Sequence, residues 1–177
     1  NLLASYNPET RTTARKQTGS FYTPREIVQY MVDESLVAHL KQNVGPDLEP
    51  EYRKLTRYGD ENLELTEKQK AQIVNALTSC RILDPACGSG AFPMGILQQL
   101  VHILNRLDPD NRHLKAEAIK QVQEEVNQLG DDSADVDENM EKMQETLKLF
   151  DEAATRPDYA RKLLLIENSI YGVDIQP

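Results

Sequence analysis

The sequence predicts a helix-dominated α/β protein with few parallel strands. A short apolar run at residues 81–83 (Arg-Ile-Leu) leads into a turn at 84–90 (Asp-Pro-Ala-Cys-Gly-Ser-Gly), and an amphipathic segment follows from Ala91. That order is typical of a strand, a tight turn and a helix. A second strand-like run at 169–174 (Ser-Ile-Tyr-Gly-Val-Asp) ends in a carboxylate. Elsewhere the apolar residues recur at helical spacing, so only these two strands are predicted.

The composition allows one domain with a core. The chain has 177 residues, of which 39% are hydrophobic and 28% charged. No apolar run approaches the roughly 18 residues that a membrane helix needs, so we expect no membrane partner. The net charge of −9 argues against this chain as the main nucleic-acid surface, although residues 1–25 have a local net charge of +3. With no visible signal peptide and no disulfide framework from Cys80 and Cys87, we expect a cytoplasmic location.

A helix start is predicted at residues 23–26 (Thr-Pro-Arg-Glu). Thr23 is placed to cap the helix, Pro24 suits the first helical position, and Glu26 completes a capping box. The helix should end near Asn43, before a Gly-Pro pair. Its predicted apolar stripe consists of Ile27, Val28, Met31, Val32, Leu36, Val37 and Leu40.

Further helices are predicted at residues 50–58, from Thr66 to the first strand, from Ala91 to a stop signal at 108–110, at 113–129, at 138–153 and at 157–168. Gln69 follows Thr66 at the spacing of a second capping box. The residues expected to face inward are Ala71, Ile73, Val74 and Leu77, then Phe92, Ile96, Leu97, Leu100, Val101, Leu104 and Leu107, and finally Tyr159, Leu163, Leu164 and Ile166.

These elements suggest two regions. Residues 1–80 form an N-terminal arm and a helical region, and residues 81–177 start an α/β domain with a helical insertion at about 108–156. A parallel sheet of two strands is a poor independent fold. Because the chain also begins with Asn and stops at Pro177, where another helix would normally begin, we expect it to be the first part of a larger domain.

Three nucleotide-binding motifs compete for the glycine turn. A P-loop needs a Lys after its last glycine, and Gly90 is followed by Ala91. A dinucleotide fingerprint fits Gly88 and Gly90 but meets Pro93 in its third glycine position, and no acid ends a strand about 20 residues later. A methyl-donor site remains, because S-adenosylmethionine has no phosphate to cradle. Asp84 would favour its cationic end, and Asp174 would hold its ribose hydroxyls.

Three segments resemble, in order, the gamma-type arrangement of bacterial adenine-N6 DNA methyltransferases from restriction–modification or phage-defence systems. Residues 19–24 (Gly-Ser-Phe-Tyr-Thr-Pro) resemble the upstream cofactor motif, residues 84–90 the main cofactor motif, and residues 171–177 (Tyr-Gly-Val-Asp-Ile-Gln-Pro) the ribose-binding motif. The resemblance implies a Rossmann-like fold that binds S-adenosylmethionine, and double-stranded DNA as the partner of the full-length protein. It implies cofactor-binding roles for Tyr22, Thr23, Asp84, Ala86, Gly88, Ser89, Gly90, Asp174 and Ile175.

The catalytic motif of that family is missing from the chain. Adenine amino methylation uses Asn or Asp followed by Pro-Pro and an aromatic residue that stacks on a flipped base. No such tetrapeptide occurs, so we expect no catalytic residue here and a chain that is inactive alone. Cys87 is assigned to packing, because the cytosine-C5 enzymes place their cysteine directly after proline. We expect no metal site. Two alternatives stay open: a methyltransferase acting on RNA or protein, and a helical interaction module without a ligand.

Overall fold

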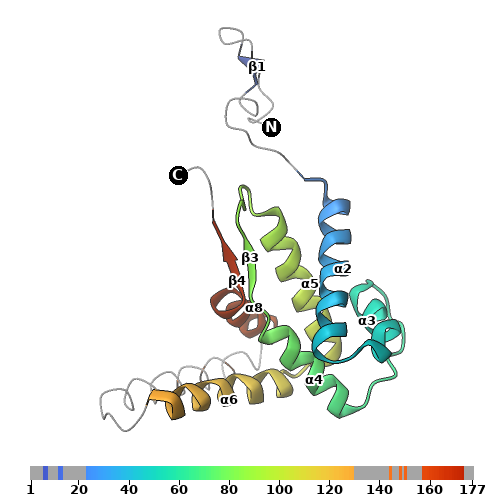
Figure 1. Cartoon of the computed structure of the whole chain (residues 1–177), viewed down its shortest axis with the longest axis vertical. Helices are drawn as coiled ribbons and strands as arrows, with labels where there is room; N and C mark the ends of the chain where they lie inside the picture. The colour runs from blue at the N-terminus through green and yellow to red at the C-terminus, as the bar shows by residue number, and fades with distance from the viewer. Residues whose placement is uncertain are drawn as a thin grey trace.

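The computed structural model describes residues 6–7, 12–13, 23–129, 144, 148, 150 and 157–173. Its helical elements are α2 (Arg25–Asn43), the 3-10 turn η2 (Pro46–Leu48), α3 (Glu49–Thr56), α4 (Glu67–Thr78), α5 (Ala91–Leu107), α6 (Arg112–Leu129) and α8 (Pro157–Asn168). Its strands are β1 (Tyr6–Asn7), β2 (Thr12–Thr13), β3 (Ile82–Asp84) and β4 (Ile170–Gly172). Helices α2, α3 and α4 gather on one side of α5, and α8 lies beside β4 (Figure 1).

Both predicted strands form, and they pair in parallel. Ile82 lies opposite Ile170, and Asp84 lies opposite Gly172. The described part is therefore helix-dominated with a small parallel sheet, which is compatible with an α/β class. Two strands do not by themselves make a Rossmann-like sheet. Parallel strands need a long crossover connection, and here the chain between them contains α5, α6 and α8.

The prediction of only two strands was wrong. β1 and β2 form an antiparallel pair, with Tyr6 opposite Thr13 and Asn7 opposite Thr12. Strands of two residues are too short to show the alternation by which a strand is recognised in a sequence. The rest of the predicted arm up to residue 20 lies outside the described residues, as does most of the helix predicted at 138–153.

Helix α2 ends at Asn43 as predicted, but its predicted capping box was wrong. The helix begins at Arg25, so Pro24 occupies the N-cap position, and no side chain caps the first turn. Thr23 is then one residue too far from the free amides of that turn to reach them. The predicted capping box at Thr66 and Gln69 is confirmed, with both of its hydrogen bonds present. Helix α5 also ends where the sequence predicts, with Asp108 as its C-cap.

The core lies between α2, α4 and α5, with contributions from α3 and α8. From the predicted stripe of α2, Ile27 and Met31 are 49% and 48% exposed, so their assignment to the core was wrong. The stripe is wider than the contact that α2 makes, and its first turns bury only Val28 and Val32. The buried apolar residues of α2, α4 and α5 are Val28, Val32, Leu36, Val37, Leu40, Ile73, Val74, Ala76, Leu77, Leu97, Leu100, Val101, Ile103, Leu104 and Leu107.

The inward face predicted for helix α8 was wrong in part: Leu164 packs against the core as predicted, but the buried residues are others. Tyr159 and Ile166 are 59% and 52% exposed, whereas Ala160, Arg161 and Leu165 are buried. Arg161 is fully buried because its guanidinium has partners: it donates to the backbone oxygens of Asp108 and Pro109 at 2.6 and 2.7 Å. It also bonds the Asp158 carboxylate at 2.7 Å. This cation therefore ties the start of α8, which leads into β4, to the end of α5.

Helices α2 and α5 approach closely at Gly95. A Cβ on Gly95 would lie 2.6 Å from Cγ1 of the buried Val28, closer than two carbon atoms can pack. Beside this contact, Gln29 donates to Asp33 at 2.8 Å and to the buried Gln99 at 3.1 Å. Burial raises the pKa of Asp33, partly offset by the hydrogen bond from Gln29. The glycine and the polar bridge hold the N-terminal halves of the two helices together.

We predict that Gly95→Ala destabilises the protein by about 1 kcal/mol, because overpacking costs about 1–3 kcal/mol and outweighs the gain of about 1 kcal/mol in helix propensity. Urea unfolding measures the effect. Since Val28 is the clashing neighbour, the pair Gly95→Ala and Val28→Ala should be less destabilising than the sum of the single changes. Strict additivity would contradict the contact.

We predict that Arg161→Ala lowers the free energy of unfolding by about 3 kcal/mol, because it leaves buried carbonyl oxygens without donors. Arg161→Lys should be intermediate, because an ammonium group cannot reach all of these acceptors at once. The neighbouring Lys162 is exposed, so Lys162→Ala serves as the matched control and should change stability by less than about 0.5 kcal/mol. Equal effects at the two positions would show that Arg161 does not brace α8.

Candidate functional site

The segment at 84–90 is a turn that connects β3 to α5. Asp84 ends the strand, and its Oδ1 accepts a hydrogen bond from the Ala86 amide at 3.1 Å, which starts the turn. The Gly90 amide then donates to the Cys87 carbonyl at 2.7 Å and closes it. Gly90 is the N-cap of α5, without a side-chain cap. The predicted order of strand, tight turn and helix is therefore present.

Two glycines give the turn its shape. Gly88 and Gly90 have φ angles of +48° and +78°, in the left-handed region that glycine adopts without steric cost. A Cβ on Gly90 would meet nothing within 4 Å, so the backbone conformation, not crowding within the protein, requires glycine there. Among the described residues none covers this side of the turn, and Ala86, Gly88 and Ser89 are exposed, so a ligand can approach the backbone there.

The end of β4 is bonded to both sides of the turn. The Val173 amide donates to the Asp84 carbonyl at 2.9 Å, and the Val173 carbonyl accepts from the Cys87 amide at 3.0 Å. Val173 thus bridges the start and the middle of the turn. The last described residue of this segment, Val173, therefore lies beside the glycine turn, although the two are far apart in the sequence.

Some backbone amides of the turn are hydrogen-bonded within the protein, and for others no partner is found in the described residues. Those of Ala86, Cys87 and Gly90 have partners within the protein. In the described part of the chain no backbone partner is found for the amides of Gly88, Ser89, Ala91 and Phe92. The third helical residue, Pro93, has no amide hydrogen to offer, so this helix start presents fewer donors to a phosphate than an ordinary one.

The Asp84 side chain places a carboxylate at the start of the same turn. Its Oδ1 is used by Ala86, and no hydrogen bond to its Oδ2 is found within the described residues. A carboxylate beside open amides repels a polyphosphate and attracts a cation. The turn therefore suits a ligand with a cationic or zwitterionic end.

The predicted site residues fall into two groups. Asp84, Ala86, Gly88, Ser89 and Gly90 all lie in the turn, with Ala86, Gly88 and Ser89 exposed. Thr23 lies just before α2, half-buried, and caps nothing. Because Val28 faces Gly95, the first turns of α2 and α5 are neighbours, so the start of α2 is at the same end of the molecule as the turn (Figure 1).

The other predicted residues, Tyr22, Asp174 and Ile175, lie outside the described residues. Asp174 directly follows Val173 in the sequence, and the hydrogen bonds described above are those of Val173 alone. The cofactor role predicted for each of the three stays a prediction.

Cys87 packs in the way the sequence analysis assigned to it. A Cβ on Gly172 would lie 3.2 Å from the Cys87 sulfur and 3.3 Å from its Cβ, so the cysteine lies directly against β4. Sequence reasoning did not single out Gly172 or Gly95. Both act through contacts with residues far away along the chain, and a local sequence pattern does not predict such contacts.

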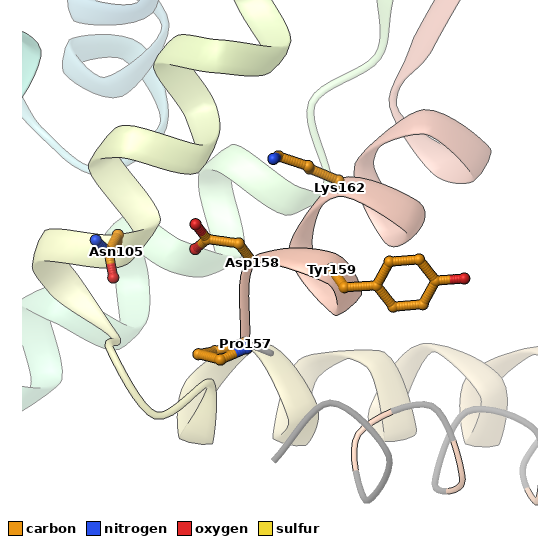
Figure 2. A pocket seen from close by; sticks show the side chains of 5 residues that line it. All are labelled: Asn105, Pro157, Asp158, Tyr159 and Lys162. Atoms are coloured by element: carbon orange, nitrogen blue, oxygen red, sulfur yellow. The ribbon is translucent and has the colours of Figure 1, made fainter. Parts of the chain in front are cut away.

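A separate hollow of about 500 Å³ lies between the end of α5 and the start of α8. It is lined by Asn105, Pro157, Asp158, Tyr159 and Lys162. Figure 2 shows the Asp158 carboxylate on the side of Asn105, while the Tyr159 ring extends away from both. Asn105 is near the opposite end of α5 from Gly90, roughly 20 Å along the helix, so this hollow is not part of the turn site.

Two kinds of site are not found in the described part of the chain. No group of three or more His, Cys, Asp or Glu side chains is placed to hold a metal ion there. None of the described helices has both the length and the apolar composition to cross a bilayer.

Comparisons with known proteins add no relative to these observations. No protein-family model, no curated protein and no solved structure matches the chain.

We predict that Gly90→Ala costs about 1–2 kcal/mol in the free energy of unfolding, because alanine pays for the left-handed backbone that glycine adopts freely. Gly59→Ala is the matched control: Gly59 also has open space around it, and its φ lies outside the left-handed region. Chemical denaturation compares the two. If both variants unfold like the parent, the turn does not have the conformation described.

Proposed function

We propose that this chain is the S-adenosylmethionine-binding part of a site-specific DNA adenine-N6 methyltransferase of a restriction–modification system. The observation that carries the proposal is the junction of the glycine turn with the end of β4. Val173 bonds both Asp84 and Cys87, so the main cofactor motif lies beside the strand that leads into the ribose-binding motif. The fold needed for the finer assignment, a Rossmann-like sheet, is part of this proposal.

The chemistry of the turn supports this donor over a nucleoside polyphosphate. Asp84 offers a carboxylate oxygen to the cationic end of the ligand, and the open amides of Ser89 and Ala91 suit its carboxylate. Gly88 and Gly90 place no side chain over the turn. Asp174 would grip the ribose hydroxyls, Ile175 would border the adenine, and Thr23 with Tyr22 would border the methionine end.

When bound, the donor supplies a methyl group on a sulfonium. The residues of this chain bind and orient it. They do not hold the acceptor base, because the Asn/Asp-Pro-Pro-aromatic motif is absent from the sequence. A flipped adenine amino group would be held by other residues of the full-length enzyme, and catalysis there would come from alignment of the two groups. Double-stranded DNA is thus a partner of the whole enzyme, in the cytoplasm.

Self-association of this chain belongs to the same proposal. Leu83 and Tyr171 are cross-strand neighbours in the parallel pair, and they are 64% and 43% exposed. Parallel sheets are normally covered on both faces. The exposed pair provides an apolar surface on which two copies would meet.

Calorimetric titration of the chain tests the donor site. S-adenosylmethionine should bind and ATP should not, because a polyphosphate meets the Asp84 carboxylate and few amides. Asp174→Ala should weaken donor binding at least about tenfold, because hydrogen bonds to a charged group contribute about 1.5–3 kcal/mol. Asp84→Asn keeps the Oδ1 acceptor for Ala86 and removes only the charge, so it should weaken binding without loosening the turn.

Asp60→Asn is the control, because Asp60 is exposed and lies in the loop between α3 and α4. Unchanged donor affinity in Asp174→Ala overturns the ribose assignment. ATP binding as tight as that of the donor overturns the methyl-donor site itself.

A further inference from the structure

Gly172 is where the glycine turn rests on β4. It lies opposite Asp84 in the parallel pair, and a Cβ built on it would come within 3.2 Å of the Cys87 sulfur and 3.3 Å of the Cys87 Cβ. Few side chains in proteins pack that tightly. The missing side chain at 172 is therefore what allows the middle of the turn to approach the strand.

The contact is fixed on both sides by backbone hydrogen bonds. The amide of Val173, the next residue of the strand, donates to Asp84 O, and its carbonyl accepts from the Cys87 amide. A side chain at 172 would displace Cys87 away from β4, while these hydrogen bonds hold Cys87 close to β4. The sulfur can rotate away, but Cys87 Cβ is attached directly to the backbone of the turn and cannot yield unless the turn itself shifts.

We propose that Gly172 and Cys87 are positioning residues. Their contact sets the distance between the 84–90 turn and the end of β4. This inference rests on the proposed function in one respect: the distance between the turn and the end of β4 sets how far the amides near Gly88 lie from Val173, and so the fit of the methyl donor. Neither residue touches the donor in this role. Each acts through the backbone that it positions.

Strand propensity alone predicts the opposite effect. Glycine weakens a strand, so replacing it with alanine should help β4. Gly172 also lacks the left-handed φ that would make alanine strained there. Any loss caused by Gly172→Ala therefore comes from the contact with Cys87, which makes the substitution a clean probe.

The experiment compares the whole chain with Gly172→Ala, with Gly172→Ala/Cys87→Gly, and with Gly59→Ala as the control that has open space around it. Amide resonances of Gly88 and Gly90 report the position of the turn without ligand, and titration with S-adenosylmethionine reports the fit. Gly172→Ala should shift both resonances and weaken binding about tenfold at a temperature where it is fully folded, because small displacements of binding groups are costly.

The double variant removes both atoms that the new methyl group at 172 would meet, the Cys87 sulfur and the Cys87 Cβ, while glycine at 87 gives the turn more conformational freedom. It should return the resonances part of the way and recover about half of the lost affinity on a logarithmic scale. A purely stabilising contact would lower the melting temperature of Gly172→Ala and leave the donor affinity of the folded protein unchanged.

Unshifted Gly88 and Gly90 resonances in Gly172→Ala overturn the inference, as does a double variant identical to the single one. If the parent chain itself binds no donor, the proposed function fails, while the resonance comparison still decides whether Gly172 and Cys87 set the turn.

Discussion

The structure depends on one short bridge, in which Val173 bonds the glycine turn on both sides. Its amide reaches the carbonyl at the end of β3, and its carbonyl reaches the amide of Cys87. These two bonds continue the parallel pairing of β3 and β4 past the end of the sheet. They join two segments that a long helical stretch separates in the sequence. Without them the turn would be only a connection between a strand and a helix.

The two helices that flank this bridge, α5 and α8, are each held in place by a contact elsewhere in the described part. Helix α5 begins at the turn, and the contact between Gly95 and Val28 holds it close to α2. Helix α8 leads directly into β4, and the buried Arg161 fastens its first turn to the end of α5. The residues that hold these helices in place are thus either a glycine, Gly95, or buried side chains, Val28 and Arg161. Among the described residues no backbone partner is found for the amides of Gly88, Ser89 and Ala91, and no hydrogen bond is found to one oxygen of Asp84, so the turn offers both donors and a carboxylate oxygen to a ligand.

The sequence predicted features that depend on neighbouring residues. The capping box of Thr66 and Gln69, the end of α5 at the Asp-Pro-Asp signal and the glycine turn each need only a few consecutive residues, and all are present. The start of α2 was missed because a shift of one residue changed Pro24 from the first helical residue to the cap. Sequence patterns locate a helix end only to within one or two residues, and a capping box is lost by a shift of one residue.

Features that depend on distant contacts were not predictable. Arginine is normally a surface residue, and the carbonyl groups of Asp108 and Pro109, together with the Asp158 carboxylate, explain why Arg161 is buried. The role of Gly172 likewise requires the position of Cys87. For the candidate site, the turn residues follow from the motif, whereas the contribution of Tyr22, Asp174 and Ile175 is a proposal that rests on resemblance and on the position of Val173.

The central claim is that the glycine turn and the chain after β4 form a single binding site for a sulfonium nucleoside. Backbone resonances followed during a titration with S-adenosylhomocysteine, the demethylated form of the donor, test it directly. The amides of Gly88, Ser89 and Ala91 should move together with those of residues 173–175, and all should fit one dissociation constant. Shifts confined to one of the two segments, or centred on the hollow beside Lys162, would contradict a shared site.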